Sequence, residues 1–319
     1  MDIPSVAALW RRRPGWPQRF RARGRNVVVL YHRIARQEAP DELGMVVDSG
    51  RLERQLRALA DHFDVVPAAE VLRPRSRPAA AITFDDGYLD NLTNAVPVLR
   101  ALGLPATFFV VSDAMDGGTE FWWDQLEHLL LDDERPRQVT VVVGGRPRHL
   151  DLRDGAGRVA ALRDLGGALV GRPAEEIRAV LGRLSGGTPA RACGRHARLD
   201  AAQVAALGAD PLFDVGSHTC THSALRPLSR RGSRRELEGS RDRLAEVLGA
   251  APRLVAYPYG ARGTLRRRDA AHARRAGYDL GFVNVTGPAE GSNPYAVPRV
   301  TVGEWEPDVL LRNVTRWTR

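Results

Sequence analysis

Two adjacent carboxylates, Asp85 and Asp86, come directly after an apolar run of the sequence. This run, Ala79–Phe84, has the composition of a buried strand, and Gly87 follows the pair to complete the sequence TFDDG. A carboxylate buried at a strand end is costly unless it is paired or binds a metal ion. Adjacent carboxylates can take two different catalytic roles, because one can bind a metal ion while the other accepts a proton. The alternative interpretation is a turn in which Asp86 caps the next helix.

A second polar group follows another apolar run, Phe213–Gly216, and reads SHTCTH from Ser217 to His222. Its histidines, His218 and His222, are four residues apart, so on a helical turn both imidazoles would reach one cation. Surface histidines also occur at this spacing by chance, and the pair alone leaves both interpretations open. A carboxylate with two histidines leaves open coordination positions, as in a catalytic metal centre.

A third motif, AYPYG at Ala256–Gly260, again follows an apolar run. Its backbone N–H groups, including that of Tyr259, could face an oxyanion that develops during a reaction. The alternative is an ordinary turn formed around Pro258 and Gly260.

Apolar runs alternate with amphipathic stretches along the chain, as in strands that feed helices around a parallel sheet or barrel. Leucines at three-to-four spacing, as at Leu52, Leu56 and Leu59, indicate the helices, with two more expected around 92–99 and 237–248. The seven predicted strands are Val27–Tyr31, Phe63–Val66, Ala79–Phe84, Ala106–Val111, Phe213–Gly216, Leu254–Tyr257 and Gly281–Val285. All three motifs follow such strands, at the edge where barrel enzymes assemble their sites.

Residues 113–200 interrupt this alternation and are predicted to be an inserted α+β segment. The segment begins with Phe121, Trp122 and Trp123, whose rings could stack on a sugar or simply pack under the insertion. A leucine-rich helix to Leu131, a hairpin at Val139–Leu150 and two further helices are expected after them. No group of polar residues with metal-ligand spacing is expected there. The sequence therefore predicts a lid or packing segment inside a domain that spans residues 26–319.

The basic residues are all arginine, 47 in number, and the formal net charge is +9. Because this usage reflects a compositional bias, no nucleic-acid partner is expected from charge alone. Seven of the arginines lie in residues 1–25, where Asp2 is the only acidic residue. This basic N-terminal segment is either a solvated tail or a patch that contacts anionic membrane, where each arginine contributes about 1 kcal/mol.

No run of residues has the ~20 apolar positions of a membrane-spanning helix, and no apolar stretch of about 7–15 residues follows the basic start as in an export signal. The two cysteines, Cys193 and Cys220, offer no disulfide framework. We therefore expect a cytoplasmic protein, with peripheral membrane contact as an option.

The order TFDDG, SHTCTH, PYG, each after a strand, resembles the NodB-homology domain of the polysaccharide deacetylases, carbohydrate esterase family 4, over about residues 26–112 and 200–303. The resemblance implies a distorted (β/α)7 barrel with an insertion. It also implies that Asp86, His218 and His222 bind one divalent metal ion, with Zn²⁺ favoured and Co²⁺, Ni²⁺ or Fe²⁺ possible. Asp85 would be the base, and the metal and the Tyr259 N–H would stabilise the oxyanion.

Two departures from the family pattern concern the base and the acid. Ala256 replaces the arginine that pairs with the base, so another cation is needed, and Arg299 is the first candidate and Arg33 the second. The family's C-terminal acid histidine has no counterpart, since the histidine that follows the pair, His272, is expected to face solvent. In the poly-β-1,6-N-acetylglucosamine deacetylase branch an N-terminal histidine takes that role, and His32 looks similar. The alternative for His32 is a strand-end histidine without a role.

These features together predict a metal-dependent hydrolase that removes N-acetyl groups from N-acetylhexosamine units of an oligosaccharide, a polysaccharide or a carrier-linked sugar precursor. The partner implied is an N-acetylated glycan. The alternatives are an amidase of the same fold that cleaves a non-sugar C–N bond, and a catalytically silent homologue that binds glycan or membrane.

Overall fold

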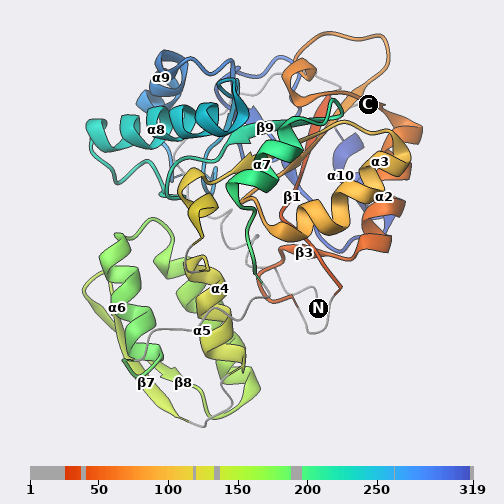
Figure 1. The fold of residues 1–319 in the computed structure, drawn as a ribbon. Coiled ribbons are helices and arrows are strands. Elements are labelled where there is room, and N and C mark those ends of the chain that lie inside the picture. The colour runs from red at the N-terminus through yellow and green to blue at the C-terminus, as the bar shows by residue number, and fades with distance from the viewer. Residues whose placement is uncertain are drawn as a thin grey trace. The chain divides into compact units, whose positions relative to one another are not determined.

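A computed structural model describes residues 26–36, 41–117, 120–132, 137–187, 196–261 and 263–316. The expectations for the basic N-terminal segment and for Cys193 lie outside the described residues. The described chain forms two compact units. One, the barrel unit, comprises residues 26–36, 41, 45–117, 198–261 and 263–316, and the other, the insertion unit, comprises residues 42–44, 120–132, 137–187 and 196–197. Figure 1 shows the elements of both.

The core of the barrel unit is a sheet in which all neighbouring strands are parallel. Its order is β12-β11-β10-β9-β6-β5-β1-β13, and β4 pairs with β5 outside this path. The strands are β1 (Val27–Tyr31), β4 (Asp64–Val65), β5 (Ala79–Phe84), β6 (Ala106–Val110), β9 (Phe213–Ser217), β10 (Leu254–Ala256), β11 (Leu280–Val283), β12 (Val297–Pro298) and β13 (Val300–Thr301). All seven predicted strands are present, with boundaries shifted by at most two residues.

Two short strands near the C-terminus close the sheet. β12 pairs with β11 at one edge and β13 pairs with β1 at the other, and Arg299 alone separates them in the chain. The expected barrel is confirmed as a nearly closed one, although eight strands lie along its path instead of seven. Strands of two residues are too short to show hydrophobic alternation, so the seven predicted strands do not include this pair.

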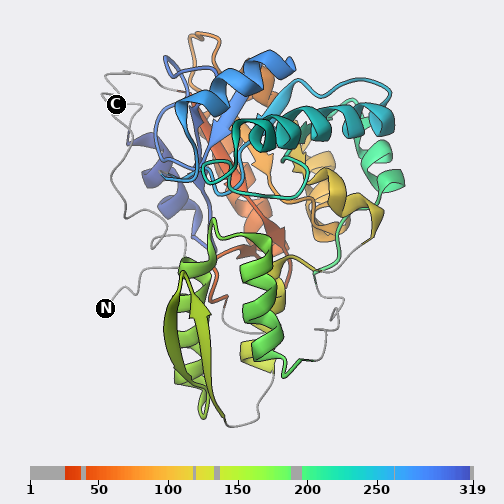
Figure 2. The same ribbon diagram turned by 90° about the vertical axis from the view of Figure 1, so that its left-hand side faces the viewer.

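Helices flank this sheet (Figure 2). α2 shows why they form, because Asp48 caps its first turn and Leu52, Leu56 and Leu59 share its buried face. The helices of the barrel unit are α2 (Ser49–His62), η1 (Ala68–Glu70), η2 (Asn91–Ala95), α3 (Val96–Leu102), η3 (Ser112–Asp116), α7 (Ala201–Gly208), α8 (Arg230–Leu248), α9 (Arg267–Ala276) and α10 (Pro307–Thr315). A separate pair, β2 (Arg33–Ile34) and β3 (Val46–Val47), forms a small parallel sheet.

The insertion unit contains the predicted hairpin and helices. The hairpin consists of antiparallel β7 (Gln138–Val143) and β8 (Arg146–Asp151). The helices are α4 (Trp122–Glu127), η4 (His128–Asp132), α5 (Gly155–Leu169) and α6 (Ala174–Leu184). The rings of Phe121 and Trp123 are buried and stacked on each other, with centroids 4.5 Å apart. Of the three aromatic residues at the start of the insertion, Trp122 is therefore the one left that could stack on a sugar. None of the helices in the described part of the chain has the length and apolarity needed to cross a membrane.

Gly216 in β9 lies where the strand is sandwiched between β6 and β10. A Cβ at this position would stand 2.4 Å from the Phe109 ring and 3.1 Å from the Leu254 carbonyl oxygen. The absence of a side chain therefore lets β9 approach its neighbours and fixes where His218, two residues later, leaves the strand.

We expect Gly216→Ala to lower the free energy of unfolding by about 1–3 kcal/mol, the usual cost of overpacking a core. Gly167→Ala is the matched control, because this exposed glycine in α5 has nothing within 4 Å of its Cβ position. The control should stabilise the protein by about 1 kcal/mol through helix propensity. Thermal and urea unfolding measure both changes, and a Gly216→Ala protein as stable as the wild type would contradict the packing argument.

Candidate active site

The two aspartates at the end of β5 point to different partners because the chain turns sharply between them. The Asp85 N–H donates to the Tyr31 carbonyl at 3.0 Å and continues the parallel pairing with β1. Asp86 and Gly87 then both adopt positive φ values, 74° and 75°. A left-handed aspartate is strained, and such residues cluster at functional sites. Asp86 faces the two histidines, and Asp85 faces Arg299.

The histidine pair lies on an irregular loop after β9, so the expected helical turn is wrong. Thr219 and His222 have positive φ values of 65° and 58°, which no helix allows. The loop is fastened by backbone bonds from the N–H groups of Ser112 and Asp113 to the carbonyls of Thr219 and Cys220. The two imidazoles nevertheless converge, with ring centroids 4.8 Å apart.

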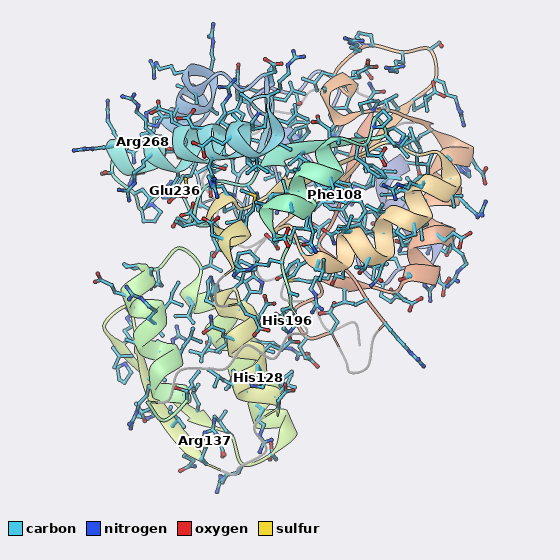
Figure 3. All side chains as sticks on the ribbon, viewed as in Figure 1. Phe108, His128, Arg137, His196, Glu236 and Arg268 are labelled. Atoms are coloured by element: carbon cyan, nitrogen blue, oxygen red, sulfur yellow. The ribbon has the colours of Figure 1, made fainter. Side chains whose placement is uncertain are left out.

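Glu236, which the sequence did not indicate, anchors the middle of this loop from α8 (Figure 3). Its Oε2 accepts the backbone N–H of Thr221 at 3.0 Å, and its Oε1 accepts the Thr221 hydroxyl at 2.8 Å. The Glu236 side chain is nearly buried. It therefore restrains the residue that immediately precedes His222.

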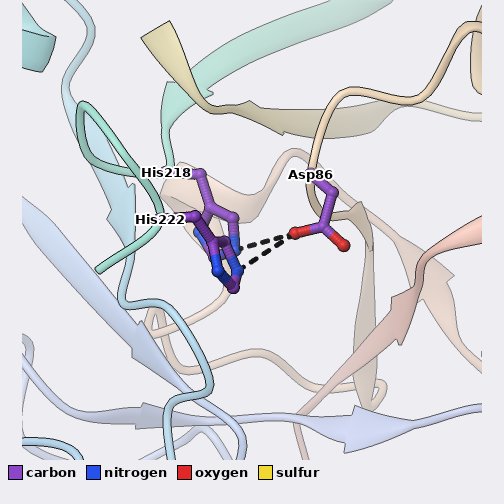
Figure 4. A group of neighbouring side chains, drawn as sticks. All are labelled: Asp86, His218 and His222. Carbon is purple, nitrogen blue, oxygen red and sulfur yellow. Dashed lines mark ion pairs between the residues drawn. The ribbon is translucent and has the colours of Figure 1, made fainter. Parts of the chain in front are cut away.

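Asp86, His218 and His222 form a group suited to a metal ion (Figure 4). Asp86 Oδ1 lies 3.3 Å from His218 Nε2 and 3.2 Å from His222 Nε2. Ligands at 2.0–2.2 Å from a tetrahedral ion are separated by roughly 3.3 Å, so the spacing fits. His218 Nδ1 lies 2.7 Å from the Ala256 carbonyl, which can only accept, so Nδ1 carries a proton and the neutral ring presents the Nε2 lone pair to Asp86. With the ring neutral, two acceptors face each other, and a proton or a metal ion is needed between them.

The pKa shifts agree with this arrangement. Burial would raise the pKa of Asp86, but hydrogen bonds from both histidines hold it far below the ordinary value. Burial lowers the pKa of His222, which favours the neutral ring that a metal needs. Burial also acts to lower the pKa of His218, but the charges of Asp85 and Asp86 raise it overall. A divalent ion would take the place of the proton that these carboxylates attract.

Arg299 makes the ion pair with Asp85. Its Nη1 donates to Asp85 Oδ1 at 2.7 Å and its Nη2 to Oδ2 at 2.6 Å, and both residues are buried. Burial would raise the pKa of Asp85, but the Arg299 charge lowers it below the ordinary value. The second candidate, Arg33, instead pairs with Asp90 at 3.1 Å and lies over the Tyr88 ring.

Asn284 is a further residue that the sequence analysis missed. Its side-chain oxygen accepts from Arg299 Nη2 at 2.6 Å, and its backbone N–H donates to the Gly260 carbonyl at 3.0 Å. It thus joins the Asp85–Arg299 pair to the AYPYG turn. The available signal was that Asn284 is the one polar residue in the predicted strand Gly281–Val285, directly after the observed end of β11 at Val283.

The AYPYG turn contacts the metal-site group. Tyr259 has a positive φ of 61°, and its ring packs edge-on against His222 with centroids 4.7 Å apart. Gly260 has a φ of 47°, and a Cβ there would stand 2.4 Å from the Asn284 nitrogen. The motif is therefore part of the site rather than a remote turn.

His32 follows β1 directly and is partly buried. The carbonyl of the preceding residue, Tyr31, accepts from the Asp85 N–H at 3.0 Å, so His32 and Asp85 leave adjacent parallel strands at the same edge of the sheet. The Asn91 side-chain amide donates to the His32 carbonyl at 2.7 Å, and His32 Nδ1 has no hydrogen-bond partner among the described residues. The expectation that His272 faces solvent is wrong, because it is buried with its Nδ1 3.1 Å from the Ser233 hydroxyl.

The insertion unit contains one group with ligand spacing, contrary to expectation: Asp124, Glu127 and His196. His196 Nδ1 lies 3.4 Å from Asp124, whereas its Nε2 lies 3.9 Å from Glu127. The imidazole thus stands between two carboxylates, as in an ion pair. Sequence spacing does not indicate this group, because His196 is distant in the chain from α4.

We expect the purified protein to bind about one equivalent of a divalent metal ion and His218→Ala to abolish this binding, because the open N/O group loses a ligand. His62→Ala, which alters a histidine at the C-terminal end of α2, should retain the metal. Elemental analysis after Zn²⁺ addition and desalting provides the measurement. Equal metal content in wild type and His218→Ala would contradict the assignment.

Comparisons with known proteins agree with this geometry. The polysaccharide deacetylase family model matches residues 73–133 and 189–281, which contain the TFDDG, SHTCTH and AYPYG motifs. No curated protein matches the sequence at a significant level.

Several solved structures share the fold. The Streptococcus pyogenes deacetylase PplD in complex with acetate has a TM-score of 0.59 and 18% identity, over 90% of this chain and 97% of that chain. IcaB from Ammonifex degensii has a TM-score of 0.56 and 19% identity, over 93% and 98%. The BpsB deacetylase domain from Bordetella bronchiseptica has a TM-score of 0.51 and 16% identity, over 88% and 96%. The family match over residues 73–133 and 189–281, the barrel and the three motifs at one edge of it identify a polysaccharide deacetylase domain in this chain, of a family of hydrolases that act on carbon–nitrogen bonds.

Proposed function

We propose that this chain is a metal-dependent de-N-acetylase that acts on N-acetylhexosamine units of an oligosaccharide, a polysaccharide or a carrier-linked sugar precursor. The observation that carries the proposal is the placement of the Asp86–His218–His222 group next to the Asp85–Arg299 ion pair. His218 Nε2 lies 3.7 Å from Asp85 Oδ2, so a metal ligand and the base are neighbours. Water and an acetamide can therefore meet both groups at once.

A divalent ion at this group would polarise the acetamide carbonyl and lower the pKa of bound water. We propose Zn²⁺, although Co²⁺, Ni²⁺ or Fe²⁺ suits the same donors. Asp85 takes the proton from the attacking water as the C–O bond forms. Arg299 keeps Asp85 ionised and orients both of its oxygens. The Tyr259 backbone N–H donates to the developing oxyanion. Cleavage of the C–N bond then releases acetate and a free amine.

The departing nitrogen must be protonated, and His32 is the group that we assign to this step. It follows Tyr31, whose carbonyl accepts from the Asp85 N–H, and His218 and His222 belong to the metal-site group. Of the other histidines, His62 bonds to the Ala58 carbonyl within α2. His272 is tied to Ser233 between α8 and α9. An N-terminal acid of this kind is the arrangement expected in the poly-β-1,6-N-acetylglucosamine deacetylase branch.

Acetate release from a panel of substrates tests the proposal. The panel contains N-acetylglucosamine oligomers with β-1,4 and β-1,6 linkages, carrier-linked N-acetylhexosamines, and simple cyclic amides. The proposal is supported if the wild type releases acetate from any of the hexosamine substrates and Asp85→Asn does not. Turnover of the cyclic amides alone would assign the chain to the non-sugar amidase alternative, and turnover of neither class would favour the silent homologue.

We expect Arg299→Gln to move the acid limb of the kcat/KM profile to higher pH. Without the guanidinium, burial raises the pKa of Asp85, so the base is protonated over a wider range. The lowered pKa also means that the pair stabilises the fold above about pH 4 and loses this contribution as the pH falls through the folded-state pKa. Breaking the pair should cost about 3–5 kcal/mol of stability at neutral pH. Arg33→Gln should leave the acid limb in place, and a limb that does not move in Arg299→Gln would refute the pairing role.

We expect His32→Ala to lower kcat by roughly 10²–10⁴-fold while metal content and thermal stability stay near wild type, because only general acid catalysis is lost. A substrate with a good leaving amine should be affected much less than one with a poor leaving amine. His62→Ala is the control and should keep the wild-type kcat. Near-normal kcat of His32→Ala on the poor leaving group would exclude His32 as the acid.

A further inference from the structure

The positive charge of the chain is concentrated in two segments. Residues 223–276 contain fourteen arginines and five carboxylates, and residues 1–25 contain seven arginines and one carboxylate. The remaining residues contain 26 arginines and 32 carboxylates and are net acidic. A general bias towards arginine cannot explain this contrast, so the segment 223–276 requires its own account.

This segment carries α8 and α9, which lie side by side (Figures 1 and 2). Each helix follows a parallel strand and its loop, so both helices begin at the carboxyl edge of the sheet, where the reactive residues lie. Exposed arginines gather at these two helix starts and in the loops before them. We call the following residues the arginine surface: Arg226, Arg230, Arg231, Arg234, Arg266 and Arg267.

One backbone hydrogen bond and two from arginine side chains to backbone carbonyls hold these like charges close together. The Arg226 N–H donates to the Thr264 carbonyl at 2.8 Å, and Arg266 Nε donates to the Arg226 carbonyl at 2.8 Å. Arg268 donates in the same way to the Leu228 carbonyl (Figure 3). The two loops are thus joined edge to edge, with their arginines on the same side of the barrel unit.

Few carboxylates neutralise the arginine surface. Asp269 is fully buried and caps α9, and Glu236 is committed to Thr221. Glu238 pairs with Arg234 at 3.1 Å. The first turn of α8 has no acidic residue, although the positive end of a helix dipole favours anions there. Cations at this end oppose stability, so their gathering points to binding of an external anion.

We propose that the arginine surface docks the barrel unit on an anionic phospholipid surface, with the reactive edge facing the lipid headgroups. Guanidinium groups bind phosphate oxygens well, and these side chains are exposed and spread over two helices and two loops, as a planar array of headgroups requires. Single-stranded nucleic acid fits less well, because the aromatic residues of this segment, Tyr257 and Tyr259, are buried and offer no stacking surface.

The arginine surface lies close in the chain to the metal-site group, which favours a membrane that carries the substrate. The loop 223–229 links His222 directly to α8, so a planar surface in contact with Arg226 and Arg230 borders the metal-site group. Such contact would bring a carrier-linked N-acetylhexosamine to the site, and in this respect the inference rests on the proposed function. Vesicle binding is measured without turnover, so membrane docking and deacetylase activity can fail separately.

The test is co-sedimentation of the full chain with vesicles of phosphatidylcholine alone and with vesicles that also contain about 30% phosphatidylglycerol, at about 100 mM salt. Wild type should partition strongly to the anionic vesicles only. The combined variant Arg230→Gln, Arg231→Gln and Arg234→Gln should lose about 5-fold in partitioning per arginine, on the order of 100-fold in all.

The control removes the same charge elsewhere on the barrel unit, through Arg57→Gln, Arg100→Gln and Arg253→Gln, all at exposed positions. It should bind anionic vesicles nearly as well as wild type, and thermal unfolding confirms that both variants fold. Equal losses in the two variants, or none in the first, would overturn the proposal. Tighter binding of wild type to duplex DNA than to anionic vesicles at the same salt would also overturn it.

Discussion

The buried ion pair between Asp85 and Arg299 is the contact on which both the fold and the site depend. Two charges removed from water are stable only when their geometry is good and their remaining polar atoms are bonded. Here the pair is bidentate, and Thr83 and Asn284 accept further bonds from the same guanidinium, whose Nε has no hydrogen-bond partner among the described residues. Arg299 is also the residue between β12 and β13, the strands that close the sheet. The same residue, Arg299, therefore links the strands that close the barrel and keeps the base ionised.

The same edge of the barrel concentrates backbone strain. Among the described residues, the non-glycine residues with positive φ are Asp86, Thr219, His222 and Tyr259. Every one belongs to a motif of the site, and each conformation persists because neighbouring contacts hold it. Glu236 holds the histidine loop from α8, and Asn284 holds the AYPYG turn from the end of β11. Residues without chemistry of their own thus fix the position of those that react.

Two neighbouring aspartates acquire different roles from their surroundings. Asp85 faces a permanent cation, so it remains an ionised base although it is buried. Asp86 faces the Nε2 atoms of two imidazoles, one of which is oriented by the Ala256 carbonyl at its Nδ1. A single backbone turn between the two residues separates a proton-accepting carboxylate from a metal-binding one.

The sequence by itself determined the alternation of strands and helices, the edge at which the motifs lie, and the identity of the carboxylates and histidines. These follow from hydrophobic periodicity and from polar residues placed directly after strands. Tertiary structure decided what local pattern cannot encode. Arg299 rather than Arg33 pairs with Asp85, because the closing strands carry it into the barrel while Arg33 turns to Asp90. The histidines converge from a strained loop instead of a helix, and Asn284 and Glu236 enter the site through contacts between residues far apart in the chain.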